Sequence, residues 1–141
     1  MNLLIVGTVA FDSIETPHAK ADRIIGGAAT YIGLAASYFT KDLGIISVVG
    51  EDFPTEYLEL LKKYKINLEG LQIIKGEKSF FWAGKYHNNM NNRDTLITEL
   101  NVLANFDPIV PESQKSPEFL MLGNLTPIVQ EKVINQLPKR P

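Results

Sequence analysis

Three short, uninterrupted apolar runs constrain the fold of this chain more than any other feature of its sequence. The runs LLIV, IISVV and FLML occupy residues 3–6, 45–49 and 119–122, and a glycine follows each of them directly. Apolar runs of this length, without polar alternation, are typical of strands buried on both faces of a parallel sheet. Because parallel neighbours need long crossover connections, the runs predict an α/β fold.

Helical patterns follow these runs, as an α/β fold requires. Apolar residues at helical spacing predict helices over residues 27–39, 54–64 and 127–137, so we expect a parallel sheet flanked by helices. On the first helix, the stripe expected to face the core contains Ala28, Tyr31, Ile32, Ala35 and Phe39.

Two further segments, residues 11–25 and 71–100, differ in character from the rest of the chain. Aromatic and β-branched residues there are separated by proline, glycine and asparagine turns, which predicts short strands in a small, largely antiparallel sheet. This sheet would be inserted between the parallel units. We expect residues 1–141 to belong to one domain.

Composition excludes several classes of protein. The chain has 45% hydrophobic and 21% charged residues and a net charge of −2, so it carries no basic footprint for nucleic acid. It has no cysteine, which excludes disulfides, thiolate metal sites and cysteine nucleophiles. No basic leader is visible, and no apolar stretch approaches the roughly 20 residues of a membrane span. These features predict a cytoplasmic protein that does not enter a membrane.

The pair Gly26-Gly27 stands directly before the first predicted helix, and two interpretations of it remain open. The glycines could let the helix start pack closely against a strand, where a Cβ atom would clash. Alternatively, they could let the backbone approach a ligand, because free N–H groups at a helix start donate readily to oxygen atoms.

Polar residues after two of the predicted strands are candidate ligand contacts. Asp12 and Asn124 follow the first and last apolar runs, at the carboxyl edge where α/β sheets bind ligands. Trp82 could line a pocket or simply pack in a strand. A dinucleotide-binding oxidoreductase would need glycine where Val9 and Asp12 stand, so that alternative lacks its fingerprint. The two histidines are far apart, and we predict no metal site.

Three stretches together resemble the ribokinase-like (PfkB) carbohydrate kinase family. They are VGTVAFDSI at residues 6–14, GGAATYIGLAAS at 26–37 and VVGEDFP at 48–54. The resemblance implies a ribokinase-like, Rossmann-like parallel sheet with an inserted β-sheet lid over the acceptor site. By this resemblance, the segments 11–25 and 71–100 provide the lid strands.

The resemblance also implies a function and a set of site residues. The family transfers phosphate from ATP, with Mg²⁺, to a hydroxyl group of a sugar or nucleoside. Asp12, Gly26 and Gly27 match the motif positions that hold the acceptor, and Asn124 is a further candidate. Many relatives carry asparagine where this chain has Tyr31, which could contact the acceptor through different chemistry.

One family signature is missing from these residues. The stretch D-T-x-G-A-G-D, which supplies the catalytic base and an anion hole in the family, does not occur. The resemblance therefore implies the N-terminal, acceptor-binding half of a kinase, which should not transfer phosphate alone. The alternative is a non-catalytic binding or assembly protein, with homodimers formed through the lid strands.

Overall fold

A parallel sheet forms the body of the computed structural model, which describes residues 1–141. Its strand order is β5-β4-β1-β9, β6 also pairs with β4, and every pairing is parallel. The strands are β1 (Leu3–Val6), β4 (Leu43–Gly50), β5 (Ile66–Asn67), β6 (Leu71–Ile74) and β9 (Phe119–Leu122). The three apolar runs thus form β1, β4 and β9, which confirms the predicted parallel sheet.

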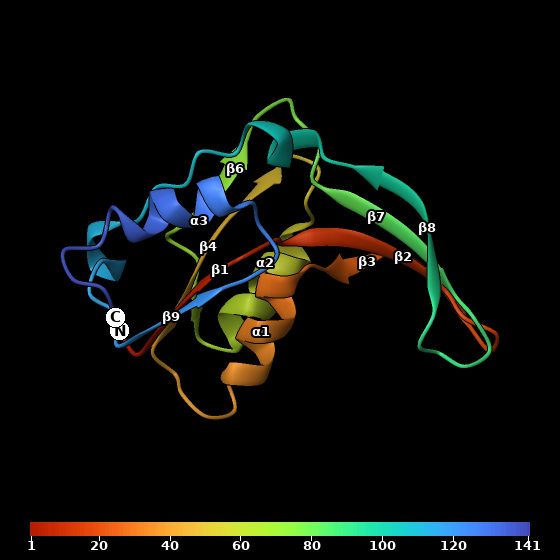
Figure 1. Ribbon diagram of the computed structural model, residues 1–141, viewed down its shortest axis with the longest axis horizontal. Helices are drawn as coiled ribbons and strands as arrows, with labels where there is room; N and C mark the ends of the chain where they lie inside the picture. The colour runs from red at the N-terminus through yellow and green to blue at the C-terminus, as the bar shows by residue number, and fades with distance from the viewer.

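Helices cover both faces of this sheet. One face carries α1 (Ala28–Ala36) and α2 (Thr55–Lys63), and the other carries α3 (Pro127–Ile134) with the 3₁₀ turns η1 (Asn101–Asn105) and η2 (Glu112–Gln114) (Figure 1). Alternate residues of β1 enter the two cores, because Ile5 packs under α1 and α2 whereas Leu4 packs on the α3 side. Burial on both faces explains why β1 and β4 contain no polar alternation. The same expectation was wrong for β9, an edge strand on which Phe119 and Met121 are exposed.

The buried face of α1 differs in part from the predicted stripe: Ile32 packs against the core as predicted, but the prediction was wrong for Tyr31, Ala35 and Phe39. Tyr31 is 53% exposed and Phe39 is 92% exposed, whereas Ala29, Thr30 and Gly33 are buried. A Cβ atom on Gly33 would lie 3.1 Å from Ile66 Cδ1, so α1 approaches the sheet most closely through its small residues. Ile32 and Leu34 pack beside this contact and are partly buried.

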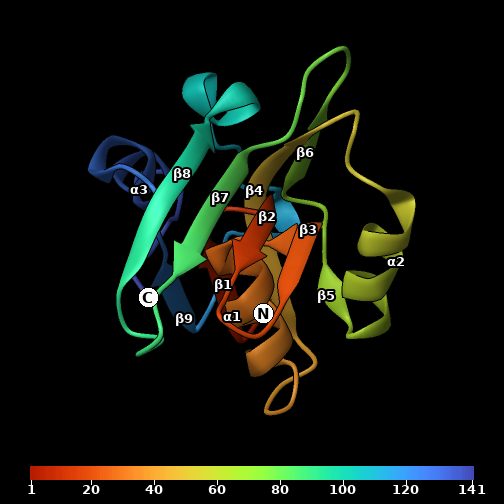
Figure 2. The same ribbon diagram turned by 90° about the vertical axis from the view of Figure 1, so that its right-hand side faces the viewer.

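A second sheet of four strands projects from one end of the body and is called the lid. Its strands are β2 (Ala10–Glu15), β3 (Lys20–Gly26), β7 (Phe81–Tyr86) and β8 (Arg93–Glu99). They lie in the order β3-β2-β7-β8, with antiparallel outer pairs and a parallel central pair (Figure 2).

The second lid segment begins later than the predicted residue 71. β6 pairs with β4 of the body through Ser47 and Leu71, so only the chain from β7 onward lies in the lid sheet. The sequence of β6 has the same β-type residues as the lid strands, so residue type alone does not show which sheet it joins. Its pairing with β4 follows from where α2 and β5 leave the chain. The corrected lid strands cover residues 10–26 and 81–99.

Asp52, in the loop after β4, ties the body to both halves of the lid. Its Oδ1 atom accepts hydrogen bonds of 2.7 Å from the backbone N–H and the hydroxyl of Ser79, just before β7. Its Oδ2 atom lies 3.5 Å from Arg23 on β3, whose guanidinium also stacks 4.4 Å from the ring centre of Phe11. The buried Ser79 hydroxyl in turn accepts from the Gly50 N–H at 2.9 Å.

Asp52→Ala should destabilise the protein by about 1–3 kcal/mol, because two donors of the buried Ser79 lose their acceptor. Asp52→Asn keeps an acceptor oxygen and is the matched control, expected to retain most of the stability. The measurement is the free energy of unfolding from chemical denaturation. Equal stability of Asp52→Ala and the unmodified protein would contradict this role.

Candidate functional site

The register of β1 and β9 brings two distant segments together at the carboxyl edge of the body sheet. Val6 pairs with Leu122, and the Gly123 N–H donates to the Val6 carbonyl at 2.6 Å. Two residues further along each strand, Thr8 and Asn124 therefore lie side by side. The Asn124 Oδ1 atom accepts from the Thr8 backbone N–H at 3.3 Å and from its hydroxyl at 3.1 Å.

The two positions before α1 require glycine for different structural reasons. A Cβ atom on Gly26 would collide with the carboxylate of Asp12, so this glycine leaves room for that side chain. Gly27 has a φ of 93° and lies against the Thr8 carbonyl, where a Cβ atom would collide with backbone. The structure therefore confirms the close packing of the helix start, and the approach of this backbone to a ligand stays a prediction.

Asp12 lies on β2 beside this helix start, and its half-buried side chain has no cationic partner. Burial raises the pKa of Asp12, and a hydrogen bond from the Gly27 backbone N–H partly offsets the rise. A carboxylate in such a place is an acceptor with unused capacity for hydroxyl groups. Burial also raises the pKa of Tyr31, as do the negative charges of Asp12 and Tyr86.

A cavity of about 310 Å³ lies between the lid and the start of α1. The predicted residues Asp12, Gly27, Tyr31 and Asn124 all line it, and Gly26 lies behind Asp12. The other lining residues are Thr8, Ala28, Phe80, Trp82, Tyr86 and Arg93. Four residues predicted from separate parts of the sequence thus meet in one cavity.

The lid side of this cavity is aromatic. The Trp82 ring lies over Gly84, where any Cβ atom would collide with it, and its Nε1 atom donates to the Thr95 hydroxyl at 3.3 Å. The Arg93 guanidinium lies 5.6 Å from the Trp82 ring centre. Sequence reasoning missed Thr8, Tyr86 and Arg93, because only the pairing of β1 with β9 and of β7 with β8 brings them here.

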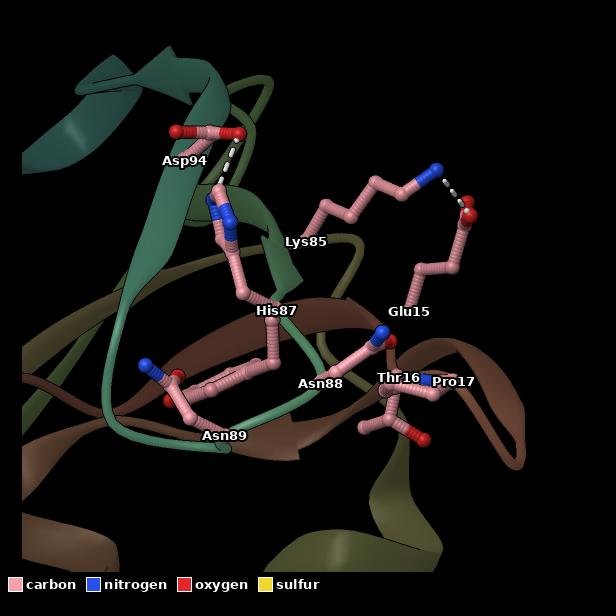
Figure 3. Close-up of a pocket in the computed structure, with 9 residues that line it drawn as sticks. Glu15, Thr16, Pro17, Lys85, His87, Asn88, Asn89 and Asp94 are labelled. Carbon is pink, nitrogen blue, oxygen red and sulfur yellow. Dashed lines mark hydrogen bonds and ion pairs between the residues drawn. The ribbon is translucent and has the colours of Figure 1, made fainter.

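A second cavity, of about 760 Å³, lies at the outer end of the lid and contains none of the predicted site residues (Figure 3). The Lys85 Nζ atom lies 2.8 Å from Glu15 Oε1, and this ion pair raises the pKa of Lys85 and lowers that of Glu15. The His87 Nε2 atom lies 3.0 Å from Asp94 Oδ2. These charged groups pair with one another between neighbouring segments of the lid. Asp12 in the smaller cavity has no such partner.

Neither a metal-binding cluster nor a membrane-spanning helix occurs in the structure. No group of three or more His, Cys, Asp or Glu side chains gathers closely enough to hold a metal ion. None of the helices has the length and apolar character needed to cross a membrane.

Gly27→Ala should destabilise the protein more than Gly76→Ala, although both glycines have positive φ angles. Gly76 (φ 74°) has open space where the methyl group of alanine would lie, so alanine there should cost only the conformational term of about 1 kcal/mol. At Gly27 the collision with the Thr8 backbone should add about 1–3 kcal/mol. Chemical denaturation measures the difference, and equal losses would contradict the close approach.

No protein-family model matches the chain. Its sequence is 26% identical to a cytidine kinase of Thermococcus kodakarensis over 138 residues, which are 97% of this chain and 48% of that protein. The chain therefore spans about half the length of the curated relative that it matches.

Solved structures show the same relation. A nucleoside kinase of Methanocaldococcus jannaschii, an archaeal member of the ribokinase family, matches with a TM-score of 0.73 and 19% identity, over 96% of this chain and 49% of that one. Ribokinase of Cryptococcus neoformans in complex with ADP matches with a TM-score of 0.67 and 15% identity, over 92% and 44%. The chain thus has the ribokinase fold over about half of such a kinase, and its predicted resemblance to the ribokinase-like (PfkB) family is confirmed.

Proposed function

We propose that this chain is the acceptor-binding part, with its lid, of an ATP-dependent kinase that phosphorylates a hydroxyl group of a nucleoside or sugar. The observation that carries the proposal is the meeting of Asp12, Tyr31, Asn124 and the start of α1 in one cavity beneath the lid. Similarity to a cytidine kinase and to nucleoside kinase and ribokinase structures supports the same class of acceptor.

The cavity residues suit the binding of a polyhydroxylated molecule. The carboxylate of Asp12 can accept hydrogen bonds from hydroxyl groups, which discriminates hydroxylated ligands from apolar ones. Phe80 and Trp82 offer flat apolar surfaces to a sugar ring or a base. In phosphoryl transfer, positioning of the acceptor and exclusion of competing water are major parts of catalysis, and a lid over the acceptor serves both.

The side chains that line this cavity do not provide a site for the Mg²⁺ ion that accompanies a phosphoryl donor. Asp12 is the only carboxylate of the cavity, and no cluster of metal-ligating side chains occurs among residues 1–141. Mg²⁺ and ATP would supply the electrostatic stabilisation of the transferred group in the complete kinase. We therefore assign the cavity to the acceptor, and we place the ATP and Mg²⁺ sites and the catalytic base outside these residues.

Binding of a small panel tests the proposal directly. Isothermal titration of the protein that carries this chain with cytidine, inosine, D-ribose and D-fructose should identify at least one ligand. That ligand should be phosphorylated when ATP and Mg²⁺ are added to the complete kinase, but not by residues 1–141 alone. His87→Ala, in the second cavity, is the control that should leave binding unchanged. Failure of all four compounds to bind would overturn the proposal.

Asp12→Asn should raise the free energy of unfolding at neutral pH while weakening acceptor binding. Burial raises the folded-state pKa of Asp12 above its unfolded value, so the ionised carboxylate penalises the folded state. This penalty is complete above the raised pKa and disappears as the pH falls through it toward the ordinary value. Acceptor affinity of the unmodified protein should fall over the same pH window, because protonation removes an acceptor oxygen.

Denaturation curves and titrations across that pH range measure both effects. The loss of affinity on acidification should be absent in Asp12→Asn. A variant that binds as tightly as the unmodified protein would contradict the proposed role of the carboxylate.

We also propose that the protein forms homodimers through the lid. All seven residues of β8 are exposed, and this edge strand presents Leu96 and Ile97, which are 57% and 46% exposed. Unpaired edges with apolar side chains favour strand pairing between subunits. The partners that we propose are therefore a small-molecule acceptor and a second copy of the chain. We also propose a cytoplasmic location, which the absence of cysteine fits because the chain carries none of the disulfides typical of secreted proteins.

Leu96→Lys combined with Ile97→Lys should shift the protein toward the monomer by placing charges in the interface. Sedimentation velocity at several concentrations measures the change. Lys85→Glu, at a charged and exposed lid position, is not expected to remove the dimer. A monomeric unmodified protein at high concentration would contradict lid-mediated assembly.

A further inference from the structure

Asn124 has only one side of its amide engaged by the protein. Its Oδ1 atom accepts two hydrogen bonds from Thr8, one from the backbone N–H and one from the hydroxyl. The Nδ2 group donates to no protein atom, although Asn124 lines the cavity. Asn124 is exposed, so its two free N–H donors are available to a ligand in the cavity that it lines.

The orientation of this amide follows from chemistry. A backbone N–H can only donate, so the atom of Asn124 that faces the Thr8 N–H must be the acceptor oxygen. A flipped amide would place an NH₂ group against an N–H group, with two donors facing each other. Thr8 therefore determines which end of Asn124 is offered to the ligand.

The Thr8 hydroxyl has both of its hydrogen-bonding roles occupied. It donates its proton to Asn124 Oδ1, and it accepts from the Ala28 backbone N–H at 3.0 Å. Thr8 is only 2% exposed, so its side chain is hardly accessible to a ligand. Its hydroxyl instead joins the start of α1 to Asn124.

We propose that Thr8 is a positioning residue that fixes Asn124 as a hydrogen-bond donor. The cavity thereby offers the Nδ2 group of Asn124, and not its oxygen, to an acceptor atom of the ligand, such as a hydroxyl oxygen. The inference rests on the proposed function of the cavity and specifies the chemistry of its ligand.

Two pairs of variants separate positioning from simple packing. Thr8→Val keeps the shape but removes the hydroxyl, whereas Thr8→Ser keeps the hydroxyl. Asn124→Asp keeps an acceptor oxygen for Thr8 but replaces the free donor with an acceptor, whereas Asn124→Gln keeps the donor at a displaced position. Denaturation curves establish that each variant is folded before binding is measured.

The probes are cytidine, 2′-deoxycytidine and 3′-deoxycytidine, titrated into the full protein. In the unmodified protein, loss of the hydroxyl that contacts Asn124 should weaken binding by about 10-fold, as expected for one hydrogen bond. Asn124→Asp should weaken cytidine binding by at least this factor. Thr8→Val should reduce the discrimination between cytidine and that deoxy analogue to about 3-fold or less, whereas Thr8→Ser should preserve it. A purely structural role of Thr8 would weaken all three probes equally and overturn the proposal.

A spectroscopic measurement tests the Thr8–Asn124 link without any ligand. The side-chain NH₂ signals of Asn124, assigned by their loss in Asn124→Asp, should shift in Thr8→Val and stay in place in Thr8→Ser. Unchanged signals in Thr8→Val would refute the positioning role. If no probe binds the unmodified protein but the signals shift as expected, the proposed function fails while the positioning of Asn124 stands.

Discussion

The contact between Thr8 and the start of α1 is the constraint on which the rest of the site depends. The Thr8 carbonyl accepts from the Ala29 N–H at 2.9 Å, and its hydroxyl accepts from the Ala28 N–H. Two of the helix N–H groups that lack partners within α1 therefore donate to Thr8, which lies two residues after the end of β1. This approach is open only to a glycine at position 27, whose φ of 93° and missing Cβ permit it. The sheet, the helix and the lid strand β3 are therefore joined at one point.

The same contact explains why the cavity lies where the two sheets meet. β2 leaves the body directly after Thr8 and Val9, and β3 returns directly into Gly27, so both lid strands are anchored within a few residues of the helix start. Asp52 anchors the other side by holding Ser79 before β7. A lid attached at these points stays over the carboxyl edge of β1 and β9, which is where open α/β sheets bind ligands.

The sequence predicted the parts of this structure that depend on local pattern. The continuous apolar runs identified β1, β4 and β9, and the glycine pair marked the start of α1 correctly. Pattern alone could not predict that α1 packs through Ala29 and Gly33, because that depends on how closely the helix approaches the sheet. The role of Thr8 was equally hidden, since it arises from a strand register that joins residues 116 positions apart. The second lid segment begins at β7 because β6 pairs with β4 of the body, and strand propensity does not reveal such a choice of partner.

The charges around the cavity leave Asp12 without a cationic partner. Three cations of the lid are already engaged, since Arg23 pairs with Asp52, Lys85 pairs with Glu15 and Arg93 stacks on Trp82. Asp12 therefore keeps a half-buried carboxylate whose pKa is raised by burial, and the hydrogen bond from the Gly27 N–H only partly offsets the rise. The hydroxylated ligand that we propose would supply hydrogen-bond donors without bringing a charge, and its binding would relieve the cost of burying this carboxylate. A cation beside Asp12 would remove that cost in advance and with it part of the affinity for the ligand.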